Sequence, residues 1–373
     1  MRTQSNRKGI MATNKNQHYV PKCYLKEFTY DSEGKAINVF NLDRNKLISM
    51  APVKNQCSRD YFYGKSDKLE SAIQFVEGAY ASTLKELLNN PQSINEKHTI
   101  VLKRFWLLQY LRTEASSRRS VEMTNGIGEV AGISAEEFNI EIKDAVIMGM
   151  KIFAKKMDII DDLKVCLITN KTKFPFISSD DPAALSNRWH LNDQRTKFRS
   201  FGLQTSGNLL FLPLSPKLMF LAYDVNVYSI KHKNGVVGIS NITDVKSFNQ
   251  HQILNCRANV FVKEKEHEEF VANSIDEVSI NRNAERHRIN YAVLDFNDGE
   301  YSRYKVVAPE NLEDHEEAII HSETIHYQPT LWPSIIRWRN NGLVYTNGTG
   351  MGYLRKYHAF KEPNGFYKEP IRV

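Results

Sequence analysis

The sequence predicts an α+β fold, in which a layer of three long helices packs on a mixed β-sheet and a smaller β-rich part follows at the C-terminal end. Two patterns predict it. Apolar residues recur at intervals of three and four through residues 67–163, which is typical of amphipathic helices. Short apolar runs bounded by Pro, Gly, Asn or Ser follow in residues 165–262, which is typical of strands.

The three helices are expected in succession. The first covers residues 67–89 and ends before a proline. The second starts at Ser93 and Glu96, a capping-box pattern that satisfies free backbone amides of the first turn, and runs to about residue 119. The third starts at a similar pair, Ser134 and Glu137, and buries one apolar face.

The strands are expected on both sides of the helical block. Residues 18–63 show short strand and turn patterns. After the helices, strands are predicted at 165–169, 176–177, 208–212 and 218–222, then a helix at 243–256 and a strand at 259–262.

Three parts of the chain are expected from composition. Residues 1–15 form a basic arm, residues 16–282 a core domain, and residues 283–373 a β-rich C-terminal subdomain. This last part contains two strand patterns, an acidic run at 310–317 and an Asn347-Gly348 hairpin.

Composition limits the class of protein. The chain has 373 residues, 41% of them hydrophobic, which predicts a folded globular protein. No run reaches the roughly 20 apolar residues of a membrane span, and no signal-peptide pattern opens the chain, so cytoplasmic residence without membrane contact is expected. The four cysteines lack CxxC spacing, so neither a zinc site nor a disulfide framework is predicted.

Basic residues are clustered in the loop at residues 185–201. The net charge of +7 permits nucleic acid or a nucleotide as partner. In this loop Arg195 and Arg199 lie near Trp189 and Phe198, a mixture that suits phosphate neutralisation and base stacking. The alternative is an ordinary solvated loop.

Polar side chains interrupt the apolar stripes of the first two helices. Glu77 stands between Ile73 and Tyr80, and Gln109 and Arg112 lie one turn apart on the next helix. A buried charge is normally paired. The stripe therefore indicates a structural Glu77–Arg112 ion pair, a polar pocket in which Arg112 grips a phosphate or carboxylate, or an exposed face.

Two further residues carry chemistry that the sequence leaves open. His18 could transfer protons or bind a metal, and it could equally be a satisfied structural histidine. Asp180 follows a strand and precedes a proline turn, where an acid can bind a metal or substrate or can close an Asx turn. Walker, HExxH, GxSxG and zinc-deaminase patterns are absent from the sequence.

Several of these stretches resemble one bacterial family, the domain of unknown function 4238, over about residues 16–265. They are the segment 16–21 (Asn-Gln-His-Tyr-Val-Pro), the segment 24–28, the pair Glu70 and Glu77, Gln109-x-x-Arg112-Thr113, and the segment 178–182. The resemblance also places an asparagine, Asn249, on the last core helix, where it could cap a strand or contact a ligand. It implies no activity.

The expected site is a polar pocket of an enzyme that acts on a phosphate-bearing substrate. The substrate would be nucleic acid or a nucleotide, the reaction a phosphodiester or nucleotide hydrolysis, and the role that of a toxin or phage-defence nuclease. His18, Arg112 and Asp180 are expected within about 10 Å of one another. The catalytic residues would be His18, Glu77 and Asp180, with Gln109, Arg112, Asn249, Arg195 and Arg199 binding substrate.

Glu77 and Asp180 are the candidates for holding a divalent metal ion. The rival hypothesis is a non-catalytic module that binds nucleic acid or protein, in which the same polar residues form a structural network.

Overall fold

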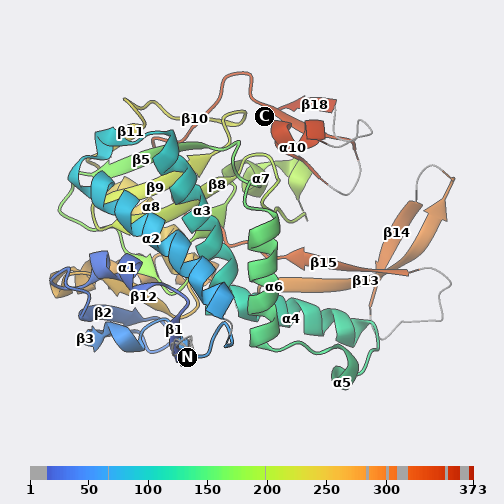
Figure 1. The fold of residues 1–373 in the computed structure, drawn as a ribbon. Coiled ribbons are helices and arrows are strands. Elements are labelled where there is room, and N and C mark those ends of the chain that lie inside the picture. The colour runs from blue at the N-terminus through green and yellow to red at the C-terminus, as the bar shows by residue number, and fades with distance from the viewer. Residues whose placement is uncertain are drawn as a thin grey trace, which may run out of the picture.

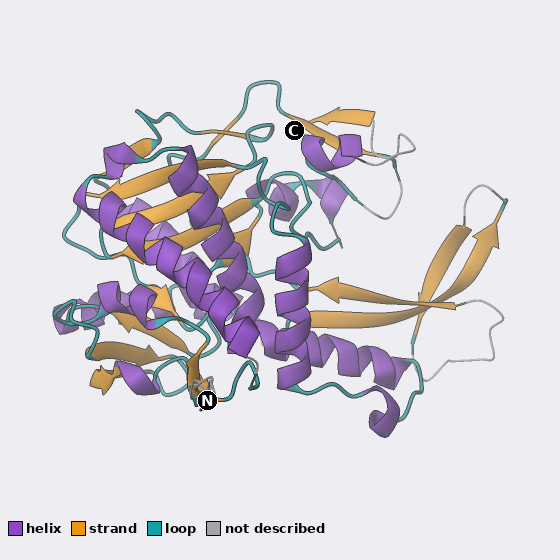
Figure 2. Cartoon of the chain, in the orientation of Figure 1, coloured by secondary structure: helices purple, strands orange, loops and turns teal. Residues whose placement is uncertain are grey.

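The chain is an α+β protein, as the sequence predicted. The computed structural model describes residues 15–65, 67–197, 199–282, 285–299, 302–308, 318–348, 352–361 and 369–373. Helices form a layer on one side of the strands, and a three-stranded sheet extends away from the rest (Figure 1, Figure 2). Nearly all of the predicted basic arm and the whole acidic run at 310–317 lie outside the described residues.

The helical layer contains α2 (Asp67–Asn89), α3 (Glu96–Arg112), α4 (Glu114–Val130) and α6 (Ile142–Lys155). The bounds of α2 are those predicted. The single helix predicted over residues 93–119 is wrong, because the backbone leaves the helical region at Thr113 (ψ 158°). Thr113 ends α3 and caps α4, with its side chain accepting a hydrogen bond from the Ser116 amide.

The start predicted for the third helix is also wrong. Residues at that position form only the short α5 (Ala135–Phe138), and the capping box of α6 consists of Glu141 and Asp144. The apolar repeat identified the correct face, since Val146, Met150 and Phe153 are buried.

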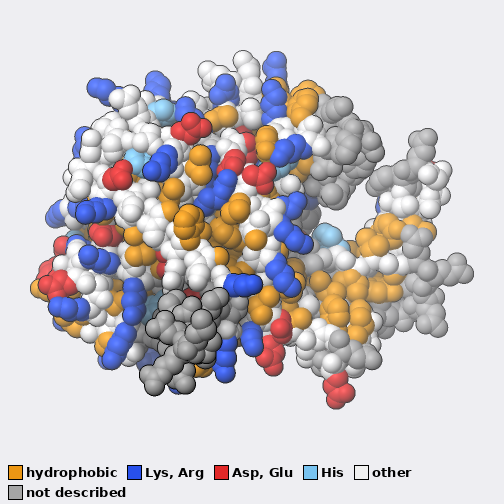
Figure 3. All heavy atoms as spheres, in the orientation of Figure 1, with side chains coloured by type: hydrophobic (Ala, Val, Ile, Leu, Met, Phe, Trp, Pro, Cys, Tyr) orange, Lys and Arg blue, Asp and Glu red, His pale blue; other side chains and the backbone are white. Residues whose placement is uncertain are grey.

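An apolar cavity of about 480 Å³ opens on the outer side of the helical layer between α2, α3 and α6. Apolar side chains gather on this face of the molecule (Figure 3). Phe75 on α2 is the most exposed of those that line the cavity, at 79%.

The central sheet has five strands in the order β11-β5-β9-β8-β7. Their bounds are β5 (Lys164–Asn170), β7 (Ala184–Ser186), β8 (Leu209–Ser215), β9 (Leu218–Tyr223) and β11 (Val236–Ile239). The sheet is mixed because β11 runs parallel to β5 while the other pairs are antiparallel.

Both faces of this sheet are covered. Alternate residues of β8 point to opposite sides of the sheet. On one side Leu210 and Leu212 pack with α2 and α3. On the other side Leu209 and Phe211 pack with Phe248 of α8 (Ile242–Asn255). Burial on two faces explains why β8 is a continuous apolar run in the sequence.

A second sheet has the order β3-β2-β12-β6. Its strands are β2 (Ala36–Asn41), β3 (Lys46–Pro52), β6 (Ser178–Ser179) and β12 (Asn259–Val262). β12 has the predicted bounds, whereas the strand predicted at 176–177 lies two residues later. β1 (Asn16–His18) pairs with β4 (Ser58–Asp60), and α1 (Lys22–Leu25) follows it.

The C-terminal part contributes one projecting sheet and several elements that pack on the core. The sheet consists of β13 (His287–Asn297), β14 (Ser302–Val307) and β15 (Ala318–Thr324), and it lies beside α4 (Figure 1). Ile336 and Tyr353 are buried in the same cluster as residues of the central sheet.

The remaining α-helices and strands are short. They are α7 (Arg188–Asn192), β10 (Tyr228–Ser229), α9 (Glu268–Asp276), β16 (Arg337–Trp338), β17 (Leu343–Thr346), α10 (Lys356–Lys361) and β18 (Glu369–Arg372).

Across the described residues, no helix has the length and apolar content needed to cross a membrane.

Candidate functional site

Arg112 is the centre of a buried network. Its side chain is fully buried, and its Nη1 donates to Oε1 of Glu77 at 2.7 Å. With the Gln109 amide oriented so that Oε1 faces the guanidinium, that oxygen accepts from Nη2 at 2.7 Å and from Nε at 2.9 Å. The structural ion pair considered from the sequence is therefore present. The guanidinium is fully buried in this network, and its role as a phosphate clamp stays a prediction.

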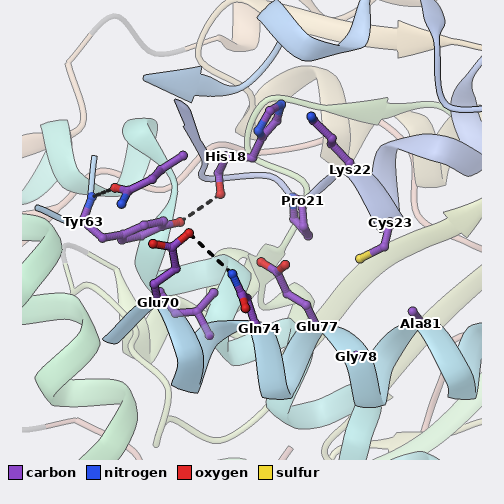
Figure 4. A pocket seen from close by; sticks show the side chains of 12 residues that line it. His18, Pro21, Lys22, Cys23, Tyr63, Glu70, Gln74, Glu77, Gly78 and Ala81 are labelled. Carbon is purple, nitrogen blue, oxygen red and sulfur yellow. Dashed lines mark hydrogen bonds between the residues drawn. The ribbon is translucent and has the colours of Figure 1, made fainter. Parts of the chain in front are cut away.

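Beside this network lies a cavity of about 340 Å³ between β1, α1 and α2, here called the histidine pocket. Its polar lining includes His18, Lys22, Tyr63, Glu70 and Glu77. Figure 4 shows His18 and Lys22 on one side of the pocket, with the two glutamates across from them on α2. Of the predicted catalytic residues, the structure brings His18 and Glu77 together here.

His18 is held as a neutral imidazole. Its Nε2 lies 3.4 Å from the carbonyl oxygen of Val53, and the Tyr63 hydroxyl donates to the His18 carbonyl at 3.2 Å. Burial lowers the pKa of His18, and the charges of Lys22 and Arg112 lower it further, against the opposing effect of the Val53 carbonyl. A neutral ring can accept a proton at neutral pH.

The Cys23 thiol also lines the histidine pocket. Burial raises the pKa of Cys23 to about 12, with the charge of Glu77 adding to the effect. The thiol therefore stays protonated at neutral pH and is a poor nucleophile.

Asp180 does not line the histidine pocket, contrary to the expectation that it would join His18 and Arg112 there. It is buried, and its carboxylate accepts backbone hydrogen bonds from Arg257 at 2.8 Å, Ala258 at 3.0 Å and Asn259 at 2.9 Å. Burial raises its pKa to about 6, while these amides act in the opposite direction. Asp180 thus fixes the connection between α8 and β12, and its catalytic role stays a prediction.

Asn249 has a structural position as well. It is fully buried, its Nδ2 donates to the Pro175 carbonyl at 3.0 Å, and its Oδ1 accepts from the Ile177 amide at 3.1 Å. Of the two roles considered from the sequence, the strand cap fits this geometry and the ligand contact does not.

The predicted metal ligands are both engaged elsewhere, Glu77 by Arg112 and Asp180 by backbone amides. Over the residues that the structure describes, no group of three or more His, Cys, Asp or Glu side chains could hold a metal ion. The expected Glu77–Asp180 metal pair is therefore not supported.

Asp181 has a role that sequence reasoning missed. It is fully buried, accepts from the Thr113 hydroxyl at 2.6 Å, and forms an ion pair with Nη1 of Arg119 at 2.7 Å. Arg119 in turn lines a second cavity. Thr113 and Asp181 both lie in stretches that carry the family resemblance, but the sequence does not show that they are in contact.

This second cavity has a volume of about 370 Å³ and is here called the arginine cavity. Its charged lining, among the described residues, comprises five arginines and two carboxylates: Arg118, Arg119, Arg257, Arg282, Arg286, Asp43 and Glu122. The arginines come from α4, from the connection between α8 and β12, and from the segment before β13. None of them was predicted as a site residue.

Contacts with the end of α8 position two of these arginines. Arg286 Nη2 donates to the Leu254 carbonyl at 2.8 Å, and Arg282 Nη2 donates to the Arg257 carbonyl. Helix C-termini present unpaired carbonyls and partial negative charge, so arginines are favoured there. This contact fixes the side chains at the mouth of the cavity.

Positive charge in the arginine cavity is only partly compensated. Arg257 and Arg286 form no ion pair within the described part of the chain. Burial lowers the pKa of Arg286, and the charge of Arg119 lowers it further, while the charge of Asp181 acts in the opposite direction. An anion bound between these side chains would relieve that repulsion.

The basic loop predicted to bind nucleic acid is largely folded. Trp189 is buried, so it cannot stack on a base, and Phe198 lies outside the described residues. Arg195 is held by Asp193, at 2.8 Å from Nε, and by the Arg372 carbonyl at 3.0 Å, and its role as a ligand contact stays a prediction. Arg199 instead lines a third cavity of about 260 Å³.

These features define an α+β protein with one mixed polar pocket and one strongly basic cavity. Residues 16–266 match the family model described as "Protein of unknown function (DUF4238)". The match covers about two thirds of the chain, so the chain belongs to this family, as its motifs predicted. No curated protein matches the chain, and no solved structure matches it. Arg282 and Arg286 lie beyond the matched region.

Proposed function

We propose that this protein binds a phosphate-bearing ligand, nucleic acid or a nucleotide, in the arginine cavity. One observation carries the proposal: five guanidinium groups and only two carboxylates line one concave site among the described residues. Glu114 and Asp181, which lie outside the lining, pair with Arg118 and Arg119, and Asp43 pairs with Arg282. The charges that an anion would balance are therefore those of Arg257 and Arg286.

The residue type favours phosphate. Guanidinium groups are planar, stay protonated, and bind phosphate oxygens through two parallel hydrogen bonds. The volume of about 370 Å³ lies in the range of small-ligand pockets. A nucleotide, or one unit of a nucleic-acid chain, therefore fits both the charge and the size of the cavity.

The geometry favours binding over the catalytic arrangement expected from the sequence. That arrangement required Gln109, Arg112 and Asp180 to face a common pocket, and their polar atoms are satisfied inside the protein. The rival hypothesis, a structural network combined with a separate basic binding surface, agrees with these contacts.

Calorimetric titration with thymidine monophosphate tests the proposal. Arg257→Ala removes an exposed arginine without an ion pair, so the fold should be unaffected. Because a hydrogen bond to a charged group contributes about 1.5–3 kcal/mol, the affinity should fall roughly tenfold or more. Lys231→Ala is the matched control, an exposed lysine that lines none of the three polar cavities described above. Equal affinity for the parent and Arg257→Ala would refute the proposal.

A second candidate function is phosphodiester or nucleotide hydrolysis in the histidine pocket, as in a toxin or phage-defence nuclease. The observation that favours it is the neutral His18 ring in an open pocket across from Glu70 and Glu77. His18→Gln keeps a hydrogen-bonding side chain and removes the proton acceptor. We expect the parent protein to release nucleotides from a labelled oligonucleotide. The rate of release should be at least about 100-fold lower in the variant. Equal rates would exclude His18 from catalysis.

A further inference from the structure

We infer that the ligand is a single nucleic-acid strand that extends from the arginine cavity into the third cavity along the start of β13. The inference rests on the proposed function and specifies which kind of phosphate-bearing ligand the protein binds. The third cavity, here called the loop cavity, is lined by Lys197, Arg199 and Arg288 together with His190 and His326.

The loop cavity is also basic. Its three cationic side chains face one lining carboxylate, Glu323, whose oxygen lies 3.7 Å from Nη1 of Arg288. His190 and His326 add no charge at neutral pH. Burial lowers their pKa values to about 4 and about 3, respectively. The described lining thus holds more cations than carboxylates, and Arg288, whose side chain is 59% exposed, is the cation that a phosphate would contact.

Each basic cavity has one lining arginine at the start of β13. Arg286 lines the arginine cavity and Arg288 lines the loop cavity. The Arg286 carbonyl accepts from the Ile325 amide at 2.9 Å, which continues the ladder between β13 and β15 by one residue. Two residues of extended chain span about 7 Å. A flexible ligand that contacts both arginines would pass along this short stretch of β13.

The chemistry of the loop cavity suits a base as well as a phosphate. Besides its cations it presents Leu191, Ile325 and the His326 ring, which stacks on Phe201 with ring centroids 3.4 Å apart. Cations interleaved with flat and apolar groups are typical of single-strand binding sites. The pKa of His287, between Arg286 and Arg288, is lowered by burial and then by the charges of Arg119 and Arg286.

A single strand fits better than a duplex. Both sites are concave and of small volume, about 370 Å³ and 260 Å³. The bases of a paired duplex are stacked inside the helix, whereas an unpaired strand can place a phosphate in one cavity and a base in the next. A mononucleotide would occupy only the arginine cavity.

Fluorescence anisotropy with labelled oligothymidylate, competed by thymidine monophosphate, tests the inference on the full chain. Arg288→Ala should weaken oligothymidylate binding roughly three- to tenfold at about 0.15 M salt, because one phosphate contact is lost. The same variant should leave the affinity for thymidine monophosphate unchanged. Arg303→Ala is the matched control, an exposed arginine of the adjacent strand β14 that lines neither basic cavity.

The outcomes separate the inference from the proposed function. If thymidine monophosphate binds and depends on Arg257, but Arg288→Ala leaves oligothymidylate affinity unchanged, the proposed function stands and the two-cavity path is wrong. Duplex DNA binding as tightly as the single strand would also overturn the path. If neither the mononucleotide nor the oligonucleotide binds the parent protein, the proposed function itself is wrong.

Discussion

At the scale of single residues, polar side chains on apolar helix stripes marked a real feature. Glu77, Gln109 and Arg112 do meet, because the N–H groups along the edges of a buried guanidinium require acceptors. Whether such residues bind a ligand or one another depends on the exposure of Arg112, which helical periodicity does not fix.

Arg112→Lys should destabilise the protein without changing ligand affinity. An ammonium group cannot replace both the contact with Glu77 and the two contacts with Gln109. One buried oxygen left unsatisfied costs about 1–3 kcal/mol of the free energy of unfolding. Urea unfolding measures this loss, with Arg303→Lys as the exposed control. Unchanged stability combined with lost affinity for thymidine monophosphate would instead show that Arg112 is a ligand clamp.

The arginine cavity was not predictable from the same residue-level reasoning. Its arginines lie in three stretches that are far apart in the sequence, at 118–119, at 257 and at 282–286. The fold brings the stretches together. Asp180 binds the backbone of the turn before β12, and Asp181 pairs with Arg119.

At the scale of elements, the apolar patterns in the sequence predicted where helices and strands lie better than they predicted the residues at which these elements end. Residues of α2 and β12 were assigned with the observed bounds. The break between α3 and α4 was missed, because a threonine is an ordinary helix-surface residue as well as a capping residue. What fixes the break at Thr113 is a tertiary contact with Asp181, which lies 68 positions away in the sequence.

Thr113→Val should therefore weaken the junction of α3 and α4. Valine has nearly the same shape but loses the cap on the Ser116 amide and the hydrogen bond to Asp181. The expected loss is about 1–3 kcal/mol of the free energy of unfolding. Thr99→Val, which removes a hydroxyl bound only to the Glu96 carbonyl within α3, is the control for urea unfolding. A loss no larger than that of the control would show that the contact with Asp181 contributes little.

At the scale of the whole molecule, the protein should lose stability in mild acid. Burial lowers the pKa of His190 to about 4 and those of His251 and His326 to about 3. Below about pH 6.5 the unfolded chain gains protons that the folded chain does not. Each histidine therefore lowers the free energy of unfolding by up to about 1.4 kcal/mol per pH unit as the pH falls.

His251→Phe isolates this effect. The ring of His251 is fully buried and stacks on Phe211 with ring centroids 4.2 Å apart, so phenylalanine keeps this packing and loses the 3.3 Å contact between Nδ1 and the Tyr327 hydroxyl. Urea unfolding at pH 7 and pH 5 should show a smaller acid loss in the variant than in the parent. The comparison removes shared contributions such as that of Asp180, whose raised pKa of about 6 acts with the opposite sign. Equal acid losses would mean that His251 is protonated in the folded state.

The proposed function of the protein depends on the positive charge of the arginine cavity. The salt dependence of oligothymidylate affinity tests it most directly, because each phosphate contact adds about 0.7 to the magnitude of the slope of log K against log salt. Arg118→Ala combined with Arg257→Ala should reduce that magnitude by about 1.4 relative to the parent. Lys231→Ala should leave the slope unchanged. A double variant with the slope of the parent protein would contradict phosphate binding in the arginine cavity.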